Sequence, residues 1–413
     1  MLQKIGIEAK KVSKILSSIS EEQKNEALQA MSNNILKDMN YILDENQKDL
    51  IKGKEEAITD ALTDRLKLNS ERVKSMADGL IKLIKQEDPV GKIEKEWTGE
   101  NGLHFKKIRF PFGVIGVIYE ARPNVTSDVG GLCLKSGNAS ILRGSSYSLN
   151  SNRAVLESLR EGLSSAGLPP TSIQLIEETS REMGLELMKL TKYVDLLIPR
   201  GGKGLIQSMV ENATVPYILD GDGNVHLYIH EDADTEKVNR IVINSKVQRP
   251  GVCNALETLV INSKYLKENG SSVIDELLEN NVEIFIDKSL SKEYPDCKVA
   301  SREDYLTEFH DYKIAIKVVD SLDQAIVHIN TYSSGHTESI LTKDHRIGER
   351  FANSIDSSVV FINASTRFTD GEVFGLGAEI GISTQKLHVR GPMGLEALTS
   401  ERYIVKGDGQ IRE

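Results

Sequence analysis

A cysteine at a tight turn is the strongest candidate for chemistry in this sequence. Cys253 follows an Arg-Pro-Gly-Val run, in which proline ends any preceding helix and glycine lets the backbone turn sharply. Only two other cysteines occur, Cys133 and Cys297, so a disulfide framework is not expected. Burial as a small apolar side chain is the ordinary role of a free cysteine. A thiol presented at a turn can instead act as a covalent nucleophile.

The composition is that of an acidic globular protein. Hydrophobic residues make up 39% and charged residues 27% of the 413 positions, both ordinary values. The formal net charge of -10 disfavours binding to a nucleic acid backbone. No apolar run approaches the roughly 20 residues that a membrane helix needs, and the first residues lack the apolar core of a signal peptide. We therefore expect a cytoplasmic protein with no nucleic acid or membrane partner.

The elements that position this cysteine begin with a helical region and a hairpin. Apolar residues recur at helical spacing through the first ninety residues, which predicts packing helices. Residues 96–110 then alternate apolar and basic positions around Asn101-Gly102, a typical hairpin turn. Because such a hairpin often projects from the body of a domain, we expect it to pair with another subunit in a homo-oligomer.

The rest of the chain alternates predicted strands with segments long enough for helices, which indicates two parallel, doubly wound α/β domains. Such sheets bind ligands beyond the carboxyl ends of their strands, here 120–126, 143–146 and 199–204. No G-x-G-x-x-G fingerprint follows any of these strands. The expected strands are 113–119, 139–143, 172–176, 194–198, 214–218, 225–229, 257–261, 282–286, 313–319, 337–341 and 357–362.

Metal and serine chemistry are disfavoured by spacing. Asp220, Asp222, Asn224 and Glu231 match four positions of a calcium loop, but Val225 stands where the loop requires glycine. Two histidines four residues apart, at 226 and 230, fall on a predicted strand rather than a helix face, which disfavours zinc. No G-x-S-x-G elbow is present. We expect no metal site, and Cys253 remains the nucleophile candidate.

Several runs together resemble the gamma-glutamyl phosphate reductases, a family within the aldehyde dehydrogenase superfamily. The resemblance covers essentially the whole chain and implies an aldehyde dehydrogenase-like α/β fold, with two doubly wound α/β domains and a small β oligomerisation element. It implies a cofactor-binding domain at 1–95 and 110–224, a catalytic domain at 225–399, and an oligomerisation hairpin and C-terminal strand at 96–109 and 400–413. The runs are EARPNVT at 120–126, GVCNALET at 251–258, NASTRFTDG at 363–371, GLGAEIGISTQKLH at 375–388 and RGPMGLEAL at 390–398.

The resemblance implies NADPH-dependent reduction of L-glutamyl 5-phosphate to L-glutamate 5-semialdehyde with release of phosphate, a step of proline biosynthesis. Cys253 would form a thioester that accepts hydride more readily than a carboxylate does. Asn124 and the Cys253 backbone N–H would stabilise the developing oxyanion; a turn residue after proline is the alternative for Asn124. No kinase region precedes residue 90, so a separate glutamate 5-kinase is the expected upstream partner.

The resemblance also assigns contacts to cofactor and substrate. Arg143 with Ser145 would hold the 2′-phosphate of NADPH, although a solvated arginine at a strand end is an equal alternative. Gly201 and Gly202 precede a predicted helix whose amides can face phosphate, and Glu308 would contact the nicotinamide ribose. The expected substrate contacts are Arg122, Thr366 and Arg367.

One departure from hydrolytic aldehyde dehydrogenases concerns water. Those enzymes carry a glutamate before paired glycines that activates water, whereas residues 218–224 contain no glutamate and offer only the shorter Asp220 as a base. The thioester would then survive until hydride arrives. The alternatives are another acylating aldehyde dehydrogenase that uses coenzyme A or a different acyl phosphate, and a catalytically silent binding protein with the same fold.

Overall fold

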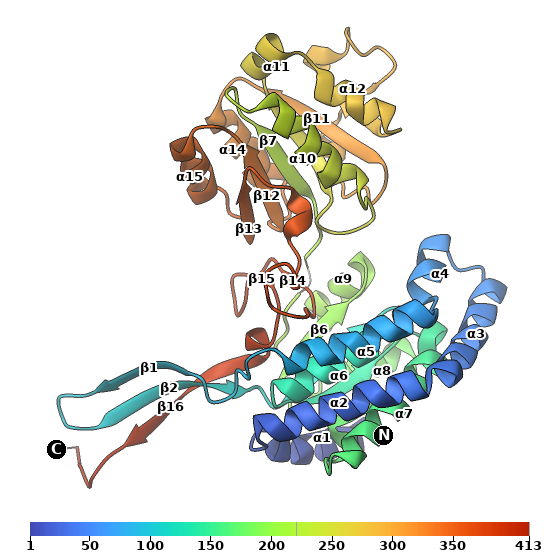
Figure 1. Cartoon of the computed structure of the whole chain (residues 1–413), viewed down its shortest axis with the longest axis vertical. Coiled ribbons are helices and arrows are strands. Elements are labelled where there is room, and N and C mark those ends of the chain that lie inside the picture. The colour runs from blue at the N-terminus through green and yellow to red at the C-terminus, as the bar shows by residue number, and fades with distance from the viewer. Residues whose placement is uncertain (220, 413) are drawn as a thin grey trace. The chain divides into compact units, whose positions relative to one another are not determined.

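The computed structural model describes residues 1–219 and 221–412, which fall into two compact units (Figure 1). Unit 1 comprises Met1–Leu219, Gly375–Gly381 and Met393–Glu413, and unit 2 comprises Asp220–Phe374 and Ile382–Pro392. The division lies close to the expected boundary after residue 224. Two stretches of the expected catalytic domain 225–399, however, pack with unit 1. The functional labels of the domains remain predictions.

Unit 1 is a four-stranded parallel sheet enclosed by helices. The sheet has the order β5-β4-β3-β6, with β3 (Val114–Tyr119), β4 (Ala139–Arg143), β5 (Ile173–Leu175) and β6 (Leu196–Arg200). The helices are α1 (Leu2–Leu16), α2 (Glu21–Lys37), α3 (Met39–Glu55), α4 (Asp60–Leu66), α5 (Ser70–Ile84), α6 (Asn124–Lys135), α7 (Leu149–Ser165), α8 (Arg181–Met188) and α9 (Lys203–Asn212), with 3₁₀ turns η1 (Ser146–Ser148), η2 (Pro170–Ser172) and η5 (Glu396–Leu398).

The predicted helical N-terminal region is confirmed, and one predicted strand is wrong. Amphipathic spacing buries Ala9, Val12 and Leu16 on one face of α1. The segment 214–218, expected to be a strand, makes only a single bridge, between Leu197 and Tyr217. Pro216 explains the difference in part, because a proline has no N–H to continue a ladder.

The predicted hairpin forms part of a three-stranded antiparallel arm, which extends away from the rest of unit 1 (Figure 1). Strand β1 (Ile93–Thr98) pairs with β2 (His104–Pro111), and β2 pairs with β16 (Thr399–Lys406). Trp97 stacks on Phe105 with ring centroids 5.1 Å apart and meets the edge of Tyr403 at 6.1 Å. Cross-strand aromatic contacts of this kind stabilise a sheet that has no helix packed over it.

Unit 2 contains a seven-stranded parallel sheet in the order β10-β9-β11-β8-β7-β12-β13. The strands are β7 (Val225–Ile229), β8 (Leu256–Asn262), β9 (Glu283–Ile286), β10 (Lys298–Val299), β11 (Lys313–Val319), β12 (Thr337–Leu341) and β13 (Val359–Ile362). The helices are α10 (Thr235–Val247), α11 (Ser263–Asn269), α12 (Ser272–Glu279), α13 (Arg302–Tyr305), α14 (Leu322–Tyr332) and α15 (His345–Ser354), with η3 (Lys288–Leu290), η4 (Thr366–Phe368) and a short antiparallel pair β14 (Ile382–Ser383) and β15 (Gly391–Pro392).

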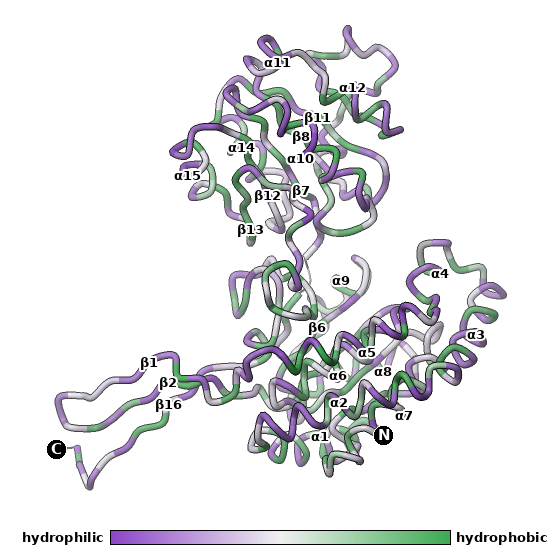
Figure 2. Tube along the Cα trace, in the orientation of Figure 1, coloured by the Kyte–Doolittle hydropathy of each residue, from purple (hydrophilic) through white to green (hydrophobic). Residues whose placement is uncertain are grey.

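Both faces of this sheet are buried. Leu227 and Leu259 belong to the apolar cluster on one face, and their neighbours Tyr228 and Val260 belong to the cluster on the other. The apolar strands appear as green segments in Figure 2. A strand that is covered on both sides tolerates few charges, so the glutamates that do occur in these strands require a local explanation.

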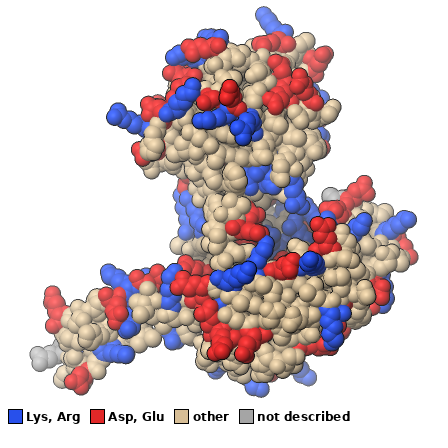
Figure 3. Space-filling model, in the orientation of Figure 1, with Lys and Arg blue, Asp and Glu red and all other residues tan. Residues whose placement is uncertain are grey.

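The outer surface is mixed in charge. Acidic and basic side chains alternate over the visible faces of both units (Figure 3). Among the residues described, none of the helices combines the length and the apolar character that a bilayer span needs.

Candidate active site

Cys253 lies in the connection between α10 and β8, at the amino end of the parallel sheet of unit 2. The connection runs from Gln248 to Ala255, and the Ala255 N–H donates to the Val252 carbonyl over 3.0 Å to close the turn. Cys253 is half-buried, whereas Cys133 is fully buried and its pKa is raised by that burial. The turn thus keeps a thiol within reach of solvent, as a nucleophile requires.

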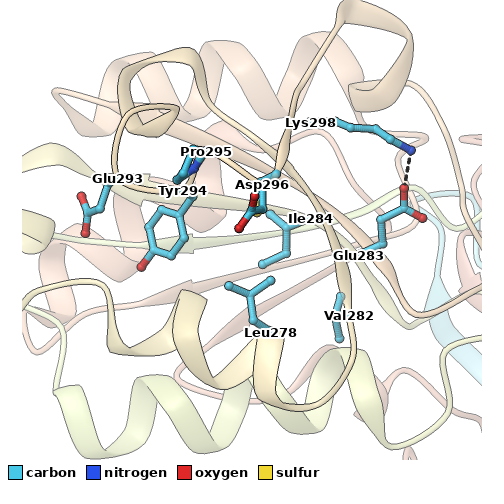
Figure 4. A pocket seen from close by; sticks show the side chains of 10 residues that line it. Leu278, Val282, Glu283, Ile284, Glu293, Tyr294, Pro295, Asp296 and Lys298 are labelled. Atoms are coloured by element: carbon cyan, nitrogen blue, oxygen red, sulfur yellow. Dashed lines mark hydrogen bonds and ion pairs between the residues drawn. The ribbon is translucent and has the colours of Figure 1, made fainter.

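Cys297 lies in different surroundings. It lines a hollow of about 370 Å³ at the amino ends of β9 and β10, and the ion pair from Lys298 to Glu283 at 2.7 Å borders one side of this hollow (Figure 4). Strand β11 separates β9 from β8 in the sheet order. This hollow therefore does not belong to the Cys253 turn.

A buried ion pair spans the nucleophile turn. Lys246, in the last turn of α10, and Glu257, the second residue of β8, meet at 2.8 Å with both side chains 0% exposed. Burial raises the pKa of Glu257 to about 7 and lowers the pKa of Lys246, while their mutual attraction opposes both changes. The other carboxylate oxygen of Glu257 accepts from the His310 N–H over 3.2 Å. Each end of the turn is thus fixed to a charge that solvent does not screen.

Gly223 packs directly against the backbone of Cys253. A Cβ added at this glycine would lie 1.7 Å from the Cys253 carbonyl oxygen, so no larger residue fits without moving the turn. The Gly223 N–H donates to Glu308 over 2.8 Å, and Glu308 also contacts the His310 ring at 3.1 Å. Burial raises the pKa of Glu308, but the His310 contact and the Gly223 hydrogen bond outweigh it and leave the pKa below its ordinary value. Asp220, the shorter base considered above, lies outside the described residues.

The segment that carries Thr366 and Arg367 is bound to the same turn. The buried Thr366 hydroxyl donates to the Asn254 carbonyl over 2.8 Å, and the Asn254 amide donates to the Thr369 carbonyl over 2.8 Å. Arg367 Nε donates to the Gln248 side chain over 2.9 Å. The Thr366 hydroxyl therefore holds one end of the turn, and Arg367 is hydrogen-bonded to Gln248 at the other.

In unit 1, Asn124 begins α6 directly after the carboxyl end of β3. Its side chain is exposed, and its Nδ2 donates to Asp128 Oδ2 over 2.9 Å. Burial raises the pKa of Asp128 to about 6, against the opposing pull of Asn124 and Arg200. One amide hydrogen of Asn124 is thus directed by Asp128, and the second can be offered to a ligand.

The expected cofactor residues gather at the carboxyl ends of β4 and β6. Arg143 ends β4, where its Nη2 donates to the Thr179 and Ser180 carbonyls over 2.6 and 2.9 Å. Its buried Nε has no hydrogen-bond partner among the described residues. Ser145 accepts from the Tyr147 N–H over 3.1 Å. An orphaned buried donor fits a ligand that brings acceptors, such as the phosphate of a nucleotide.

The glycines before α9 are held by an acidic residue. The Gly202 N–H donates to Glu120 over 2.9 Å, and a Cβ at Gly201 would lie 2.8 Å from the same carboxyl group. A Cβ at Gly204 would meet nothing within 4 Å. A ligand can therefore approach the backbone at Gly204, in the first turn of α9, more freely than at Gly201.

The structure places the expected site residues in two sets. Unit 1 brings together Arg122, Asn124, Arg143, Ser145, Gly201 and Gly202 at strand ends, and unit 2 brings together Cys253, Glu308, Thr366 and Arg367 around the nucleophile turn. Among the described residues, no group of three His, Cys, Asp or Glu side chains can hold a metal ion. Sequence reasoning missed Lys246, Glu257 and Gly223. The sequence does contain a signal for the ion pair, because Glu257 is a charged residue within the largely apolar run 256–261 and a buried charge requires a partner.

The chain is similar to proteins of known family. Residues 7–291 match the model described as the aldehyde dehydrogenase family. The chain is 50% identical to a gamma-glutamyl phosphate reductase of Clostridium botulinum over 407 residues, and 49% identical to one of Bacillus mycoides over 408 residues, in both cases with 98% of each chain covered. The crystal structure of gamma-glutamyl phosphate reductase from Thermotoga maritima matches with a TM-score of 0.97 and 42% identity over 100% of both chains.

Proposed function

The chain belongs to the gamma-glutamyl phosphate reductases of the aldehyde dehydrogenase family, and we propose that it reduces L-glutamyl 5-phosphate to L-glutamate 5-semialdehyde with release of phosphate, a step of proline biosynthesis. The observation that carries the proposal is the half-buried Cys253 thiol on a turn that a buried ion pair spans. Coenzyme A or another acyl phosphate as substrate is less favoured, because the relatives quoted above carry the glutamyl phosphate name over their full length.

The proposed chemistry runs through a covalent acyl group on Cys253. The thiolate attacks the acyl carbon, the bond to the phosphate oxygen breaks, and phosphate leaves with the electron pair. Nicotinamide cofactors, which aldehyde dehydrogenases use, supply hydride to the thioester carbon. The tetrahedral adduct then collapses, so that the carbon–sulfur bond breaks, the aldehyde leaves and the thiolate returns. We assign Asn124 and the Cys253 N–H to the oxyanion that forms at each addition.

We propose NADPH as the hydride donor. Support comes from Arg143, whose buried Nε lacks a hydrogen-bond partner in the part of the chain that the structure describes, and from the nearby Ser145 at the same strand end. Arginine matches a 2′-phosphate better than lysine does, because its planar group donates through several N–H groups. Gly201 and Gly202 would admit the cofactor backbone near α9, and Glu308 is proposed to approach the nicotinamide ribose.

Arg122 and Arg367 are the proposed contacts to the charged groups of the substrate. Arginine forks suit both carboxylate and phosphate oxygens. The Thr366 hydroxyl donates to the Asn254 carbonyl, so we propose that Thr366 supports the substrate site by positioning the Cys253 turn. The run 218–224 has no glutamate to activate water, which supports transfer of the acyl group to hydride rather than to water.

We propose a homo-oligomer in which the β1-β2-β16 arm contacts another copy. Ile93, Tyr403, Ile404 and Val405 on this arm are exposed by 48, 59, 37 and 48%, and exposed apolar side chains on an extended sheet favour association. A separate glutamate 5-kinase remains the proposed source of the acyl phosphate.

Measurement of NADP reduction with glutamate 5-semialdehyde and inorganic phosphate tests the proposal. We expect absorbance at the NADPH wavelength to rise only when both are present, and Cys253→Ala to lose all turnover while keeping its circular dichroism spectrum. Turnover that requires coenzyme A in place of phosphate would instead favour the other acylating reaction. Undiminished turnover of Cys253→Ala would rule out the thioester mechanism.

A further inference from the structure

We propose that Arg249 and Arg367 together form the site for the phosphate group of the acyl phosphate, beside the Cys253 thiol. The inference rests on the proposed function and adds Arg249 to its substrate contacts. Both arginines belong to unit 2, as does Cys253.

The geometry places Arg367 across the turn that carries Arg249. Arg367 Nε donates to Gln248, the residue directly before Arg249, over 2.9 Å. At the other end of the turn, the Arg367 carbonyl accepts from Asn254, the residue directly after Cys253, over 3.4 Å. Arg367 therefore contacts the first and the last residue of the segment 248–254. Arg249 and Cys253 lie between these two residues in the chain.

The charges around this segment are unbalanced. Among the described residues, no Asp or Glu forms an ion pair with Arg249 or with Arg367. Arg249 is exposed, and Arg367 is half-buried. Burial lowers the pKa of Arg367, and the positive charge of Arg249 lowers it further, while the Cys253 thiol and the Asp370 carboxylate oppose the change. Two guanidinium groups that lie close enough to repel one another, neither of them in an ion pair within the described residues, favour an anion that carries two charges.

The chemistry of the substrate decides which anion lies there. Attack by the thiol occurs at the acyl carbon, and a single bridging oxygen separates that carbon from phosphorus. The α-carboxylate of the glutamyl group lies at the other end of a four-bond carbon chain. A cation next to the thiol therefore meets the phosphate, and the α-carboxylate must be bound elsewhere.

In this arrangement the two arginines stabilise the leaving group. As the bond from the acyl carbon to the bridging oxygen breaks, the electron pair remains on the phosphate, and its charge grows next to Arg249 and Arg367. Hydrogen bonds that strengthen as charge develops lower the barrier for this step. In the reverse direction the same groups hold inorganic phosphate for attack on the thioester.

The first test measures phosphate binding without turnover. Inorganic phosphate bound beside Cys253 should slow alkylation of this thiol by iodoacetamide, a neutral reagent. We expect phosphate to protect the wild type and Arg240→Gln, an exposed arginine on α10 that also lacks ion pairs with the described residues. Arg249→Gln should need about ten- to a hundred-fold more phosphate for the same protection, the range expected for loss of a charge-assisted hydrogen bond. Equal protection of all three proteins, or no protection of any, overturns the proposal.

The second test separates phosphate from carboxylate. In the reverse reaction, Arg249→Gln and Arg367→Lys should raise KM for phosphate by about ten-fold or more, with KM for the semialdehyde unchanged, because the semialdehyde carries the α-carboxylate but no phosphate. A rise in the semialdehyde KM alone would assign the arginines to the carboxylate and overturn the inference. If the wild type shows no phosphate-dependent turnover, the proposed function fails, and the alkylation result still decides whether the anion site exists.

Discussion

The proposed site residues of this molecule lie at opposite ends of its two parallel sheets. In unit 1, Arg143 ends β4, and Asn124 and Gly202 follow the carboxyl ends of β3 and β6, where open α/β sheets usually bind ligands. In unit 2, Cys253 and Gly223 precede the amino ends of β8 and β7. The carboxyl ends there carry a structural network instead, in which Asp232 accepts from Thr342 over 2.7 Å and contacts His230 at 2.7 Å.

The surroundings of the two sets also differ. Asn124 in unit 1 is exposed and contacts one carboxylate, whereas the turn in unit 2 is fixed by a fully buried ion pair and by a backbone contact that only glycine permits. A non-covalent ligand can adjust to an open strand end, but a nucleophile must be held to within a fraction of an ångström. Buried ion pairs also occur among the helices of unit 1, where Lys24 meets Asp88 at 2.6 Å, so what distinguishes the Cys253 turn is that its buried pair joins the two elements that flank the proposed nucleophile.

The largest effect should follow removal of the buried cation. Lys246→Met leaves Glu257 buried without its ion-pair partner, and we expect a loss of about 3–5 kcal/mol in the free energy of unfolding. Urea denaturation measures this loss. The double variant Lys246→Met/Glu257→Leu should recover a large part of it, since no charge is then left unpaired. Equal destabilisation of the single and double variants would contradict a role for the pair in fixing the turn.

The next effect concerns unit 1. Asn124→Ala should lower kcat by about 100- to 1000-fold, as removal of an oxyanion donor does, with an unchanged melting temperature because the side chain is exposed. Asn33→Ala, at another exposed asparagine on a helix of the same unit, should leave kcat unchanged. A fall in kcat of less than ten-fold for Asn124→Ala would remove Asn124 from the oxyanion site.

A smaller loss should follow from crowding the nucleophile turn. Gly223→Ala should lower kcat by about 100-fold, because its Cβ would overlap the Cys253 carbonyl oxygen and displace the thiol. At Gly251, in the same turn, a Cβ would come no closer than 3.6 Å, to the His310 carbonyl, so Gly251→Ala should retain most activity. Similar rates for the two variants would show that the Gly223 contact does not position Cys253.

The sequence predicted the helices and strands of both units better than it predicted which ends of the strands carry the proposed site residues. Periodicity and the Asn101-Gly102 turn were enough for the helices and the hairpin, because those signals are local. The strand-end rule located the residues of unit 1, but it gave no reason to place chemistry at the amino end in unit 2. There the turn is fixed by two contacts that a local pattern does not reveal. Gly223 packs against Cys253, which is distant in the sequence, and Glu257 forms a buried ion pair with Lys246.

Arg367 shows the same limit. The chain after β13 runs back along the sheet, since Ala364 contacts Ser339 and Thr369 contacts Thr337 at the amino end of β12. Arg367 thereby reaches the edge where Cys253 lies. A reversal of this kind depends on tertiary hydrogen bonds that no local pattern encodes.

The smallest expected effect tests whether the open site of unit 1 can be tuned by pH. Asp128 directs the Asn124 amide over 2.9 Å, and burial raises the pKa of Asp128 to about 6. Asp128→Ala should lower kcat by about two- to ten-fold, the size of one hydrogen bond, and Asp128→Asn should restore it. In the wild type, kcat should fall as the pH drops through about 6, because the protonated acid is a weaker acceptor. Asp128→Asn should lack this step.

Stability should change with the opposite sign. Since the folded pKa of Asp128 is raised above the ordinary 3.8 of an aspartate, its contribution to stability is present below about pH 4 and is lost as the pH rises through about 6. The free energy of unfolding of the wild type should therefore fall over this range relative to Asp128→Asn. Urea midpoints at pH 4, 5, 6 and 7 measure the difference. If the wild type and Asp128→Asn show the same change of urea midpoint with pH and the same fall in kcat, the pH dependence belongs to another group. Asp128 would then not be the titratable partner of Asn124.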